Sequence, residues 1–265
     1  MLCLFPRQIK NPRYEIDAPV DPTVKRWFDV PCGKCYACLI NKSRDWYTRI
    51  YFEKRVWQRA YFVTLTYDDR FCDGNVHKDH LQKWFKRLRK AGFVFKYFAI
   101  SEYGPKTQRP HYHVIILTDD RMKQDDIRKS WKKGFITISN VNGKRIYYCT
   151  RYMSRKETHV DGKNDNFMLS SRRPALGFGF FEKSLKKHLD QLTPQTLHIE
   201  GVNYRVPRYY LNKLDDQVRR EYRRKLQLHQ SQFEELLKQD GYEDLAILQA
   251  EDKRKLEKFR KKSKI

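Results

Sequence analysis

The segment RPHYHVIIL at residues 109–117 constrains the fold more than any other part of the chain. Its β-branched and apolar residues predict a buried strand, and side chains two residues apart on a strand point to the same face. His111 and His113 therefore project together, while Tyr112 and Val114 face the opposite way. Two imidazoles on one face of an apolar strand are half of a metal site. The alternative is a pair of core histidines with backbone partners.

The segments around this strand predict an α+β domain with a central antiparallel sheet flanked by helices. Runs of β-branched and aromatic residues predict strands at residues 60–67, 93–101, 111–118 and 135–140. Apolar residues three and four apart predict helices at residues 41–58, 79–91, 119–133 and 147–155. Prolines break residues 1–30 and predict irregular chain there, namely Pro6, Pro12, Pro19, Pro22 and Pro31.

Changes in composition divide the chain into three expected parts. Residues 1–58 are a cysteine-containing segment with a helix, and residues 59–185 are the α+β core. Residues 186–265 form a basic C-terminal extension, with helices expected at 211–238 and 242–262.

Charge narrows the range of partners. Lysine and arginine number 56 against 32 aspartates and glutamates, for a formal net charge of +24. From residue 213 on, 15 basic residues face 11 acidic ones, so most of the excess lies in the first 212 residues. No stretch approaches the ~18 consecutive apolar residues of a membrane span, and no secretory signal is recognised. We therefore expect no membrane partner and a polyanionic one, with nucleic acid the first candidate.

A carboxylate is expected beside the histidine pair. Glu102 ends the strand before residues 109–117, and Gly104, Pro105 and Gln108 favour a hairpin between the two strands. That hairpin would bring Glu102 next to the imidazoles. Two histidines and one carboxylate leave positions open for water and a phosphate oxygen, which suits catalytic Mg²⁺ or Mn²⁺ better than a closed structural zinc site.

A second chemical signal lies in YYCTRYMSRK at residues 147–156. On a helix, Tyr148, Tyr152 and Lys156 are successive i, i+4 neighbours and form one stripe. A tyrosine oxygen is a weak nucleophile at its usual pKa of ~10, and it becomes useful where a metal polarises a phosphate. The alternative is an aromatic stripe that packs on the sheet.

The cysteines raise a separate question. Three of them follow C-x₂-C-x₂-C spacing, and a fourth near the N-terminus could complete a tetrahedral zinc site, so that the set is Cys3, Cys32, Cys35 and Cys38. Cys72 and Cys149 would stay outside it. Reduced thiols without metal are the alternative, and an iron–sulfur cluster is a lesser one.

Four stretches in this order resemble the HUH endonuclease superfamily, and more closely the replication initiators of gokushovirus-like microviruses, which are single-stranded DNA phages. They are PCGKCYAC at 31–38, FVTLTYDD at 62–69, RPHYHVIIL at 109–117 and YCTRYMSRK at 148–156. The segment SSRRP at 170–174 also resembles that family. The resemblance covers residues 31 to about 180 and implies an HUH endonuclease fold for the core at 59–185.

The resemblance also implies a role for each motif. His111 and His113 would bind the metal, with Glu102 as third ligand. One of Tyr148 and Tyr152 would attack a phosphate at the origin, keep a 5′-phosphotyrosine link and release a 3′-hydroxyl. The other tyrosine would cleave the regenerated origin, so that the displaced strand is rejoined. Lys156 matches the family's trailing lysine. The arginines expected to contact DNA are Arg109, Arg151, Arg155, Arg172 and Arg173.

The sequence therefore predicts a rolling-circle replication initiator, a metal-dependent enzyme that nicks and rejoins single-stranded DNA. Two alternatives stay open: a non-catalytic, zinc-containing nucleic-acid-binding protein, and a transposase or relaxase of the same superfamily. Viral origin DNA is the expected partner, in the cytoplasm of a bacterial host. No G-x₄-G-K-[ST] loop is present, so unwinding would need a host helicase, and a host polymerase would extend the 3′-hydroxyl.

Overall fold

The computed structural model describes residues 3–11, 26–152, 162–185, 196–222, 224–225 and 245–261. The chain forms two compact units, one of Met1–Lys42 with Gln230–Lys264 and the other of Ser43–His229. Helix α1 (Tyr36–Lys54) begins in the first unit and ends in the second. The division expected from composition, at 58/59 and 185/186, stays a prediction, because compactness alone does not define a functional domain.

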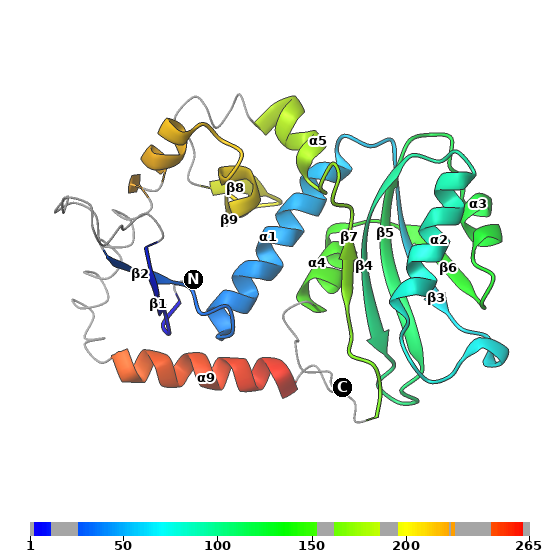
Figure 1. Cartoon of the computed structure of the whole chain (residues 1–265), viewed down its shortest axis with the longest axis horizontal. Coiled ribbons are helices and arrows are strands. Elements are labelled where there is room, and N and C mark those ends of the chain that lie inside the picture. The colour runs from blue at the N-terminus through cyan, green and yellow to red at the C-terminus, as the bar shows by residue number, and fades with distance from the viewer. Residues whose placement is uncertain are drawn as a thin grey trace. The chain divides into compact units, whose positions relative to one another are not determined.

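The second unit is built on a five-stranded antiparallel sheet in the order β6-β3-β5-β4-β7 (Figure 1). Its strands are β3 (Arg59–Thr66), β4 (Phe95–Tyr103), β5 (Pro110–Thr118), β6 (Ile136–Asn140) and β7 (Met168–Ser170). The four predicted strands are therefore present, and β5 is at the centre of the sheet. Strand β7 was not predicted. With its helices, this sheet confirms the α+β prediction of a central antiparallel sheet flanked by helices.

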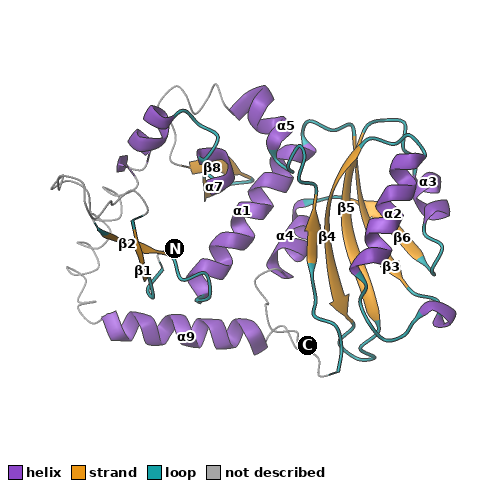
Figure 2. Ribbon diagram, in the orientation of Figure 1, coloured by secondary structure: helices purple, strands orange, loops and turns teal. Residues whose placement is uncertain are grey.

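Helices cover both faces of this sheet (Figure 2). Helices α2 (Lys78–Lys90) and α3 (Gln124–Ser130) pack on one face, where Trp84 and Phe85 contact a core that includes Tyr112 and Val114. Helices α1 and α4 (Gly143–Tyr152) pack on the other face, in a core with Ile115. Because side chains alternate along a strand, β5 contributes to both cores.

The remaining elements of this unit are short. A 3-10 turn lies at Asp69–Phe71, and helical turns lie at Phe178–Phe180, Phe181–Leu185 and Arg208–Leu211. Strands β8 (Thr196–Ile199) and β9 (Val202–Arg205) form a hairpin that the sequence did not predict. Of the helix expected at 211–238, residues 216–222 are helical, and most of the rest lies outside the described residues.

The first unit corrects the prediction of irregular chain at residues 1–30. Strands β1 (Arg7–Lys10) and β2 (Trp27–Val30) pair in antiparallel fashion, between the prolines that suggested an irregular segment. Helix α9 (Leu245–Lys261) confirms the expected C-terminal helix. Its Asp252 accepts hydrogen bonds from the Tyr36 and Ala37 amides at 3.0 and 3.3 Å, and so caps the start of α1.

The helix expected at 119–133 is shorter than predicted because the chain must extend to reach β3. The amides and carbonyls of Phe135 and Thr66 bond to each other at 3.0 Å, and the Asp68 amide bonds to the Lys133 carbonyl at 2.9 Å. Gly134 sits between these bonds at φ +148°, where a Cβ would lie 2.3 Å from the Asp68 nitrogen. Only glycine allows this close approach of two backbones. Among the described helices, none is long and apolar enough to cross a membrane.

Candidate active site

The predicted metal ligands meet where β4 and β5 pair. Glu102 lies directly opposite His111 in the antiparallel register, and Ile100 lies opposite His113. The Glu102 Oε2 atom is 3.6 Å from His111 Nε2 and 3.3 Å from His113 Nε2. The three side chains are 12–18% exposed, so they are accessible at the edge of the core. One donor atom from each lies within 4.8 Å of the other two, which is a spacing that one metal ion could bridge.

Each imidazole is oriented by a partner on its other nitrogen. His111 Nδ1 lies 3.2 Å from the Arg109 carbonyl, and His113 Nδ1 lies 3.1 Å from Thr64 Oγ1. A carbonyl only accepts, so His111 Nδ1 carries the proton and Nε2 keeps its lone pair. Such partners fix the tautomer and the ring angle of metal-binding histidines. The pair therefore has a backbone partner, as the core-histidine alternative expected, and also turns a lone pair toward a carboxylate.

Hydrogen bonds keep this cluster ionised at its carboxylate. Burial alone would raise the pKa of Glu102, but hydrogen bonds to His111, His113 and Tyr148 outweigh it and hold that pKa well below its usual range. Burial lowers the pKa of His113 and so favours its neutral form. A charged carboxylate and a neutral imidazole are the protonation states that bind a divalent cation.

Tyr148 joins this cluster from α4. Its hydroxyl donates to Glu102 Oε2 at 2.6 Å, and its ring meets the His113 ring edge-on at 5.1 Å between centroids. The residue is 39% exposed, so a large ligand could reach the oxygen. The start of α4 at Gly143, where the Asn142 side chain accepts from the Arg145 amide at 2.9 Å, gives the helix its register.

The other half of the tyrosine stripe is not described. Tyr152 is the last residue of α4, and its side chain lies outside the described residues, as do Lys156 and Arg155. Tyr148 is therefore the member of the stripe whose place beside the histidines is visible. It does not support the alternative of an aromatic stripe buried against the sheet.

The predicted DNA-contacting arginines are spread over the second unit. The Arg109 guanidinium bonds to the Tyr67 carbonyl and to Asp69, both at 2.6 Å, so it already has protein partners next to the histidine strand. Arg151 is partly buried on α4. Arg172 and Arg173 follow β7, near Tyr97, which is five residues along β4 from Glu102, or about 16 Å on a strand. These two arginines are thus far from the histidine pair.

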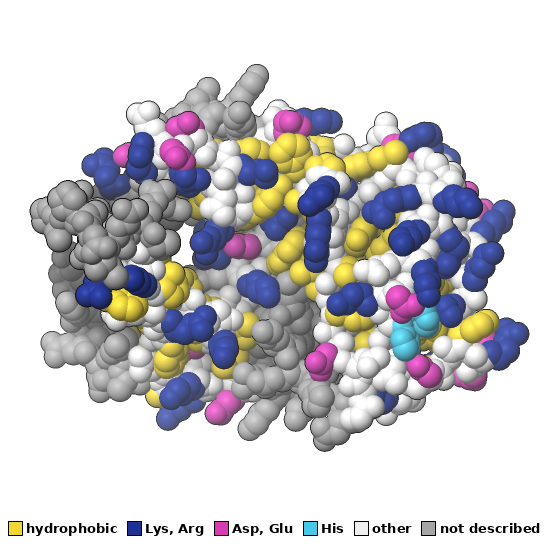
Figure 3. Space-filling view, viewed as in Figure 1, with side chains coloured by type: hydrophobic (Ala, Val, Ile, Leu, Met, Phe, Trp, Pro, Cys, Tyr) yellow, Lys and Arg dark blue, Asp and Glu magenta, His cyan; other side chains and the backbone are white. Residues whose placement is uncertain are grey.

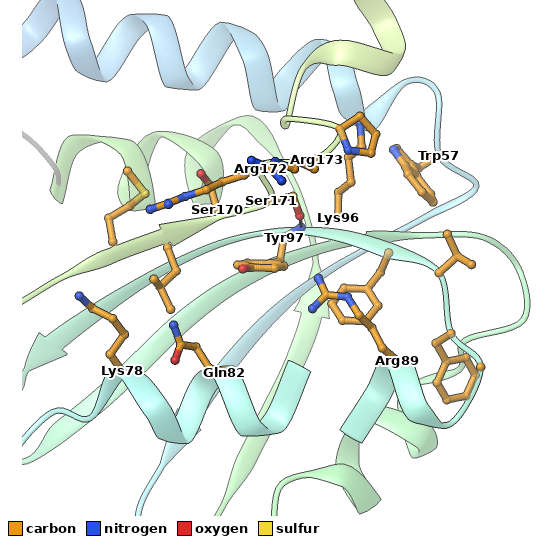
Figure 4. A pocket seen from close by; sticks show the side chains of 17 residues that line it. Trp57, Lys78, Gln82, Arg89, Lys96, Tyr97, Ser170, Ser171, Arg172 and Arg173 are labelled. Atoms are coloured by element: carbon orange, nitrogen blue, oxygen red, sulfur yellow. Dashed lines mark hydrogen bonds between the residues drawn. The ribbon is translucent and has the colours of Figure 1, made fainter. Parts of the chain in front are cut away.

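Arg172 and Arg173 line a groove of about 990 Å³ between α2 and β7 (Figure 4). Lys78 and Arg89 come from α2 on the opposite wall, and Tyr97 lies between the walls. The four cationic side chains are exposed, and lysines and arginines gather over α2 (Figure 3). Sequence reasoning found the two arginines of one wall and treated the basic face of α2 as a solvated surface.

The four predicted cysteines meet in the first unit. Cys32 and Cys38 sulfurs are 4.0 Å apart, those of Cys3 and Cys35 are 3.9 Å apart, and all four lie within 4.8 Å of one another. These distances exclude disulfides between those pairs and leave room for one central ion. Cys72 and Cys149 lie outside the cluster, as predicted.

Backbone amides also point at these sulfurs. The Lys34 and Cys35 amides donate to Cys32 Sγ at 3.4 and 3.3 Å. Burial raises the pKa of the Cys32 thiol, but these amides outweigh it and lower the pKa to about 7. Burial raises the pKa of Cys38 to about 11. Four thiols at tetrahedral spacing, one of them already acidic, fit a closed zinc site.

Sequence reasoning missed the residues that support the histidines. Thr64 and Phe62 lie on the same face of β3 as His113, and the Phe62 ring stacks on it at 5.5 Å between centroids. A signal existed, because Thr64 and Thr66 alternate within an otherwise apolar strand. Their partner could not be known, since it depends on the register of β3 with β5.

Comparisons with known proteins agree with this geometry. Residues 60–157, which hold every predicted active-site residue, match the family model of the replication-associated protein ORF2. The chain is 28% identical to Replication-associated protein ORF4 of Chlamydia phage 1, over 79% of this chain and 60% of that protein. It is 29% identical to Replication-associated protein ORF2 of Spiroplasma virus 4, over 70% and 68% of the two chains.

The chain is a relative of these replication-associated proteins. A third relative is Replication-associated protein VP4 of Bdellovibrio phage phiMH2K, 29% identical over 69% of this chain and 66% of that one. The resemblance to initiators of gokushovirus-like microviruses is thereby confirmed. The chain spans only 60% of the length of the Chlamydia phage relative. Among solved structures, hypothetical protein ORF119 of Sulfolobus islandicus rod-shaped virus 1 matches 43% of this chain and 95% of its own, at 18% identity and a TM-score of 0.29.

Proposed function

We propose that this chain initiates rolling-circle replication of a single-stranded DNA phage by nicking the origin through a tyrosine. The observation that carries the proposal is the 2.6 Å hydrogen bond from the Tyr148 hydroxyl to Glu102 Oε2. The same oxygen lies 3.3 and 3.6 Å from the two histidine nitrogens. A nucleophile, a carboxylate and two imidazoles thus share one accessible point.

His111, His113 and Glu102 would hold Mg²⁺ or Mn²⁺. When bound, such an ion polarises a phosphate and stabilises charge on the leaving oxygen. The Tyr148 oxygen attacks phosphorus, and the bond from phosphorus to the 3′ oxygen breaks. The tyrosine proton ends on that oxygen, so the products are a 5′-phosphotyrosine and a free 3′-hydroxyl. The new ester resembles the bond that was broken, so the step can be reversed without ATP and the strand can be rejoined.

Tyr152 and Lys156 complete the proposal as the resemblance implies. A second tyrosine one helical turn from Tyr148 supplies a free nucleophile while the first is still linked to DNA. Lys156 adds a cation near the reacting phosphate. Initiation of this kind takes place at viral origin DNA in the cytoplasm of the bacterial host. It requires a host polymerase to extend the 3′-hydroxyl and a helicase to open the duplex.

Two further sites belong to the proposal. Lys78, Arg89, Arg172 and Arg173 bind a DNA strand along the groove between α2 and β7, where cations contact phosphates and Tyr97 offers a ring to a base. Arg109, Arg151 and Arg155 bind DNA nearer the catalytic cluster. The cysteine cluster holds a structural Zn²⁺.

The test is incubation with circular single-stranded DNA that carries the origin of the replicon encoding this chain, with and without Mn²⁺. We expect a covalent protein–DNA product and a nicked circle only with the metal, and a Tyr148→Phe,Tyr152→Phe variant without either. Tyr147→Phe is the matched control, because Tyr147 is the adjacent exposed phenol on α4. DNA binding without any covalent product in the wild-type chain would favour the non-catalytic alternative. A linear product rejoined at a second DNA site would favour a transposase.

A further inference from the structure

A second group of metal-binding side chains lies on the other face of the sheet from the catalytic cluster. His77 precedes α2, and Asp79 and His80 lie in its first turn. The two imidazole rings are 4.6 Å apart between centroids, and one donor atom from each of the three residues lies within 4.8 Å of the others. Histidine and acidic side chains gather at the surface by this end of α2 (Figure 3). Neither the proposed chemistry nor any sequence motif uses this group.

The His77 ring is fixed by a carboxylate. Its Nε2 lies 2.8 and 3.0 Å from the two oxygens of Asp73. An ionised carboxylate only accepts hydrogen bonds, so Nε2 carries the proton and Nδ1 of the neutral ring keeps a lone pair. A carboxylate behind an imidazole is the partner that metal-binding histidines most often have.

The His80 ring is fixed by a buried chain of tyrosines. The Tyr112 hydroxyl accepts from the His77 amide at 2.7 Å and donates to the His77 carbonyl at 3.3 Å, so its single proton is used. Tyr67, whose hydroxyl is 2.6 Å away, must then donate to Tyr112. The Tyr67 oxygen is left to accept from His80 Nδ1 at 2.7 Å. His80 Nδ1 therefore carries the proton, and its Nε2 keeps a lone pair.

We propose that His77, Asp79 and His80 bind a divalent transition metal ion, with Zn²⁺ as the representative ion. Two imidazoles and one carboxylate are a donor set for zinc and its neighbours, and three protein ligands leave a position open for water or an anion. One Asp79 oxygen pairs with Lys83 Nζ at 2.9 Å, which leaves the other for the ion. Asp73 supplies a second negative charge beside the site, which offsets the positive end of the α2 dipole.

This site is independent of the catalytic one, because side chains alternate along β5. His111 and His113 point to one face, while Tyr112 between them points to the other and holds His77 and, through Tyr67, His80. An ion here would tie the segment before α2 to the central strand. It would do so without contact to the proposed nucleophile.

The experiment measures Zn²⁺ binding by calorimetry to the full chain, with its tightly held metal left in place. A His111→Ala,His113→Ala background removes the catalytic ligands. We expect this background to bind one further equivalent of Zn²⁺, and expect the equivalent to be lost when His77→Ala and His80→Ala are added. His198→Ala is the matched control, since that exposed histidine bonds only to Asn203 within the described hairpin. Unchanged stoichiometry in the quadruple variant, or weak binding that never saturates, would overturn the proposal.

A second pair of variants tests the site without removing a ligand. Asp73→Asn and Tyr67→Phe each delete an outer partner and should weaken Zn²⁺ binding about 10–100-fold. Tyr61→Phe is the control for the second, because its hydroxyl bonds to the Met122 carbonyl elsewhere on β3. Circular dichroism monitors folding, and Asp73→Asn decides the matter if Tyr67→Phe unfolds. Equal affinity in Asp73→Asn and wild type would contradict the arrangement of ligands.

Discussion

The catalytic cluster and the cysteine cluster both gather metal-binding side chains, but the chain holds them in place by different means. Glu102, His111 and His113 are fixed by paired strands at the centre of a sheet, so their positions are set by the core. Cys32, Cys35 and Cys38 lie in a turn and the start of a helix, with Cys3 brought in from the N-terminus. The sheet can keep its site without an ion, whereas the N-terminal segment depends on one to stay folded.

The largest effect should follow removal of the catalytic ligands. The double variant His111→Ala,His113→Ala should lose nicking by more than about 100-fold, since changes to outer partners alone cost that much. The thermal midpoint of the second unit should change little, because both rings lie at the edge of the core. Gel assays of nicking and a thermal melt check the two halves of this expectation. Nicking by the double variant in the presence of EDTA would refute the metal site.

The next largest effect should be on stability and not on activity. Cys35→Ser should release the zinc and lower the free energy of unfolding of the first unit by several kcal/mol, because zinc-binding free energies of about 10–16 kcal/mol are also folding free energies. Metal analysis and a thermal melt measure it, with Cys72→Ser as control. Wild-type zinc content after Cys35→Ser would show that the cluster does not hold it, and parallel loss of metal-dependent nicking below the melting range would break the comparison.

A smaller effect should come from the support of one imidazole. Thr64→Val keeps the shape of the side chain but removes the hydroxyl at 3.1 Å from His113 Nδ1. We expect Mn²⁺ affinity measured through nicking to fall about 10–100-fold, with the maximal rate partly restored at high Mn²⁺. Ser139→Ala on neighbouring β6 should have no such effect. If the two variants behave alike, Thr64 only packs in the sheet.

The smallest effect should come from the groove. Arg172→Ala,Arg173→Ala should weaken binding of single-stranded DNA several-fold and lower the slope of log K against log salt by about 0.7 for each contact removed. Arg128→Ala,Lys129→Ala on α3 removes the same charge from another exposed surface and is the control. Fluorescence anisotropy at three salt concentrations measures both. An equal change in slope for the two variants would mean that only net charge matters.

Local patterns in the sequence predicted much of the catalytic site. Alternation within RPHYHVIIL placed His111 and His113 on one face, and the short connection to the preceding strand placed Glu102 beside them. Both inferences rest on geometry within a few residues. Tyr148 was assigned through the resemblance, and its contact with Glu102 depends on how α4 packs on the sheet.

Features that depend on distant contacts were not predictable in the same way. Thr64 gained its role from the register of two strands separated by a helix. The pairing of β1 with β2 was missed because the prolines between them suggested irregular chain, although they lie outside both strands. The end of α3 at Ser130 reflects the backbone pairing near Gly134, which no local helix pattern contains.

The two-sided use of β5 restricts how this region can change during evolution. Deleting or inserting one residue ahead of His111 would turn every later side chain of the strand to the opposite face. The imidazoles would enter the aromatic core, and Tyr112 would take their place beside Glu102. Substitutions at single positions can be tolerated one at a time, but a change of length cannot. Variation in length among related chains should therefore collect in the loop between β4 and β5 and spare the strand itself.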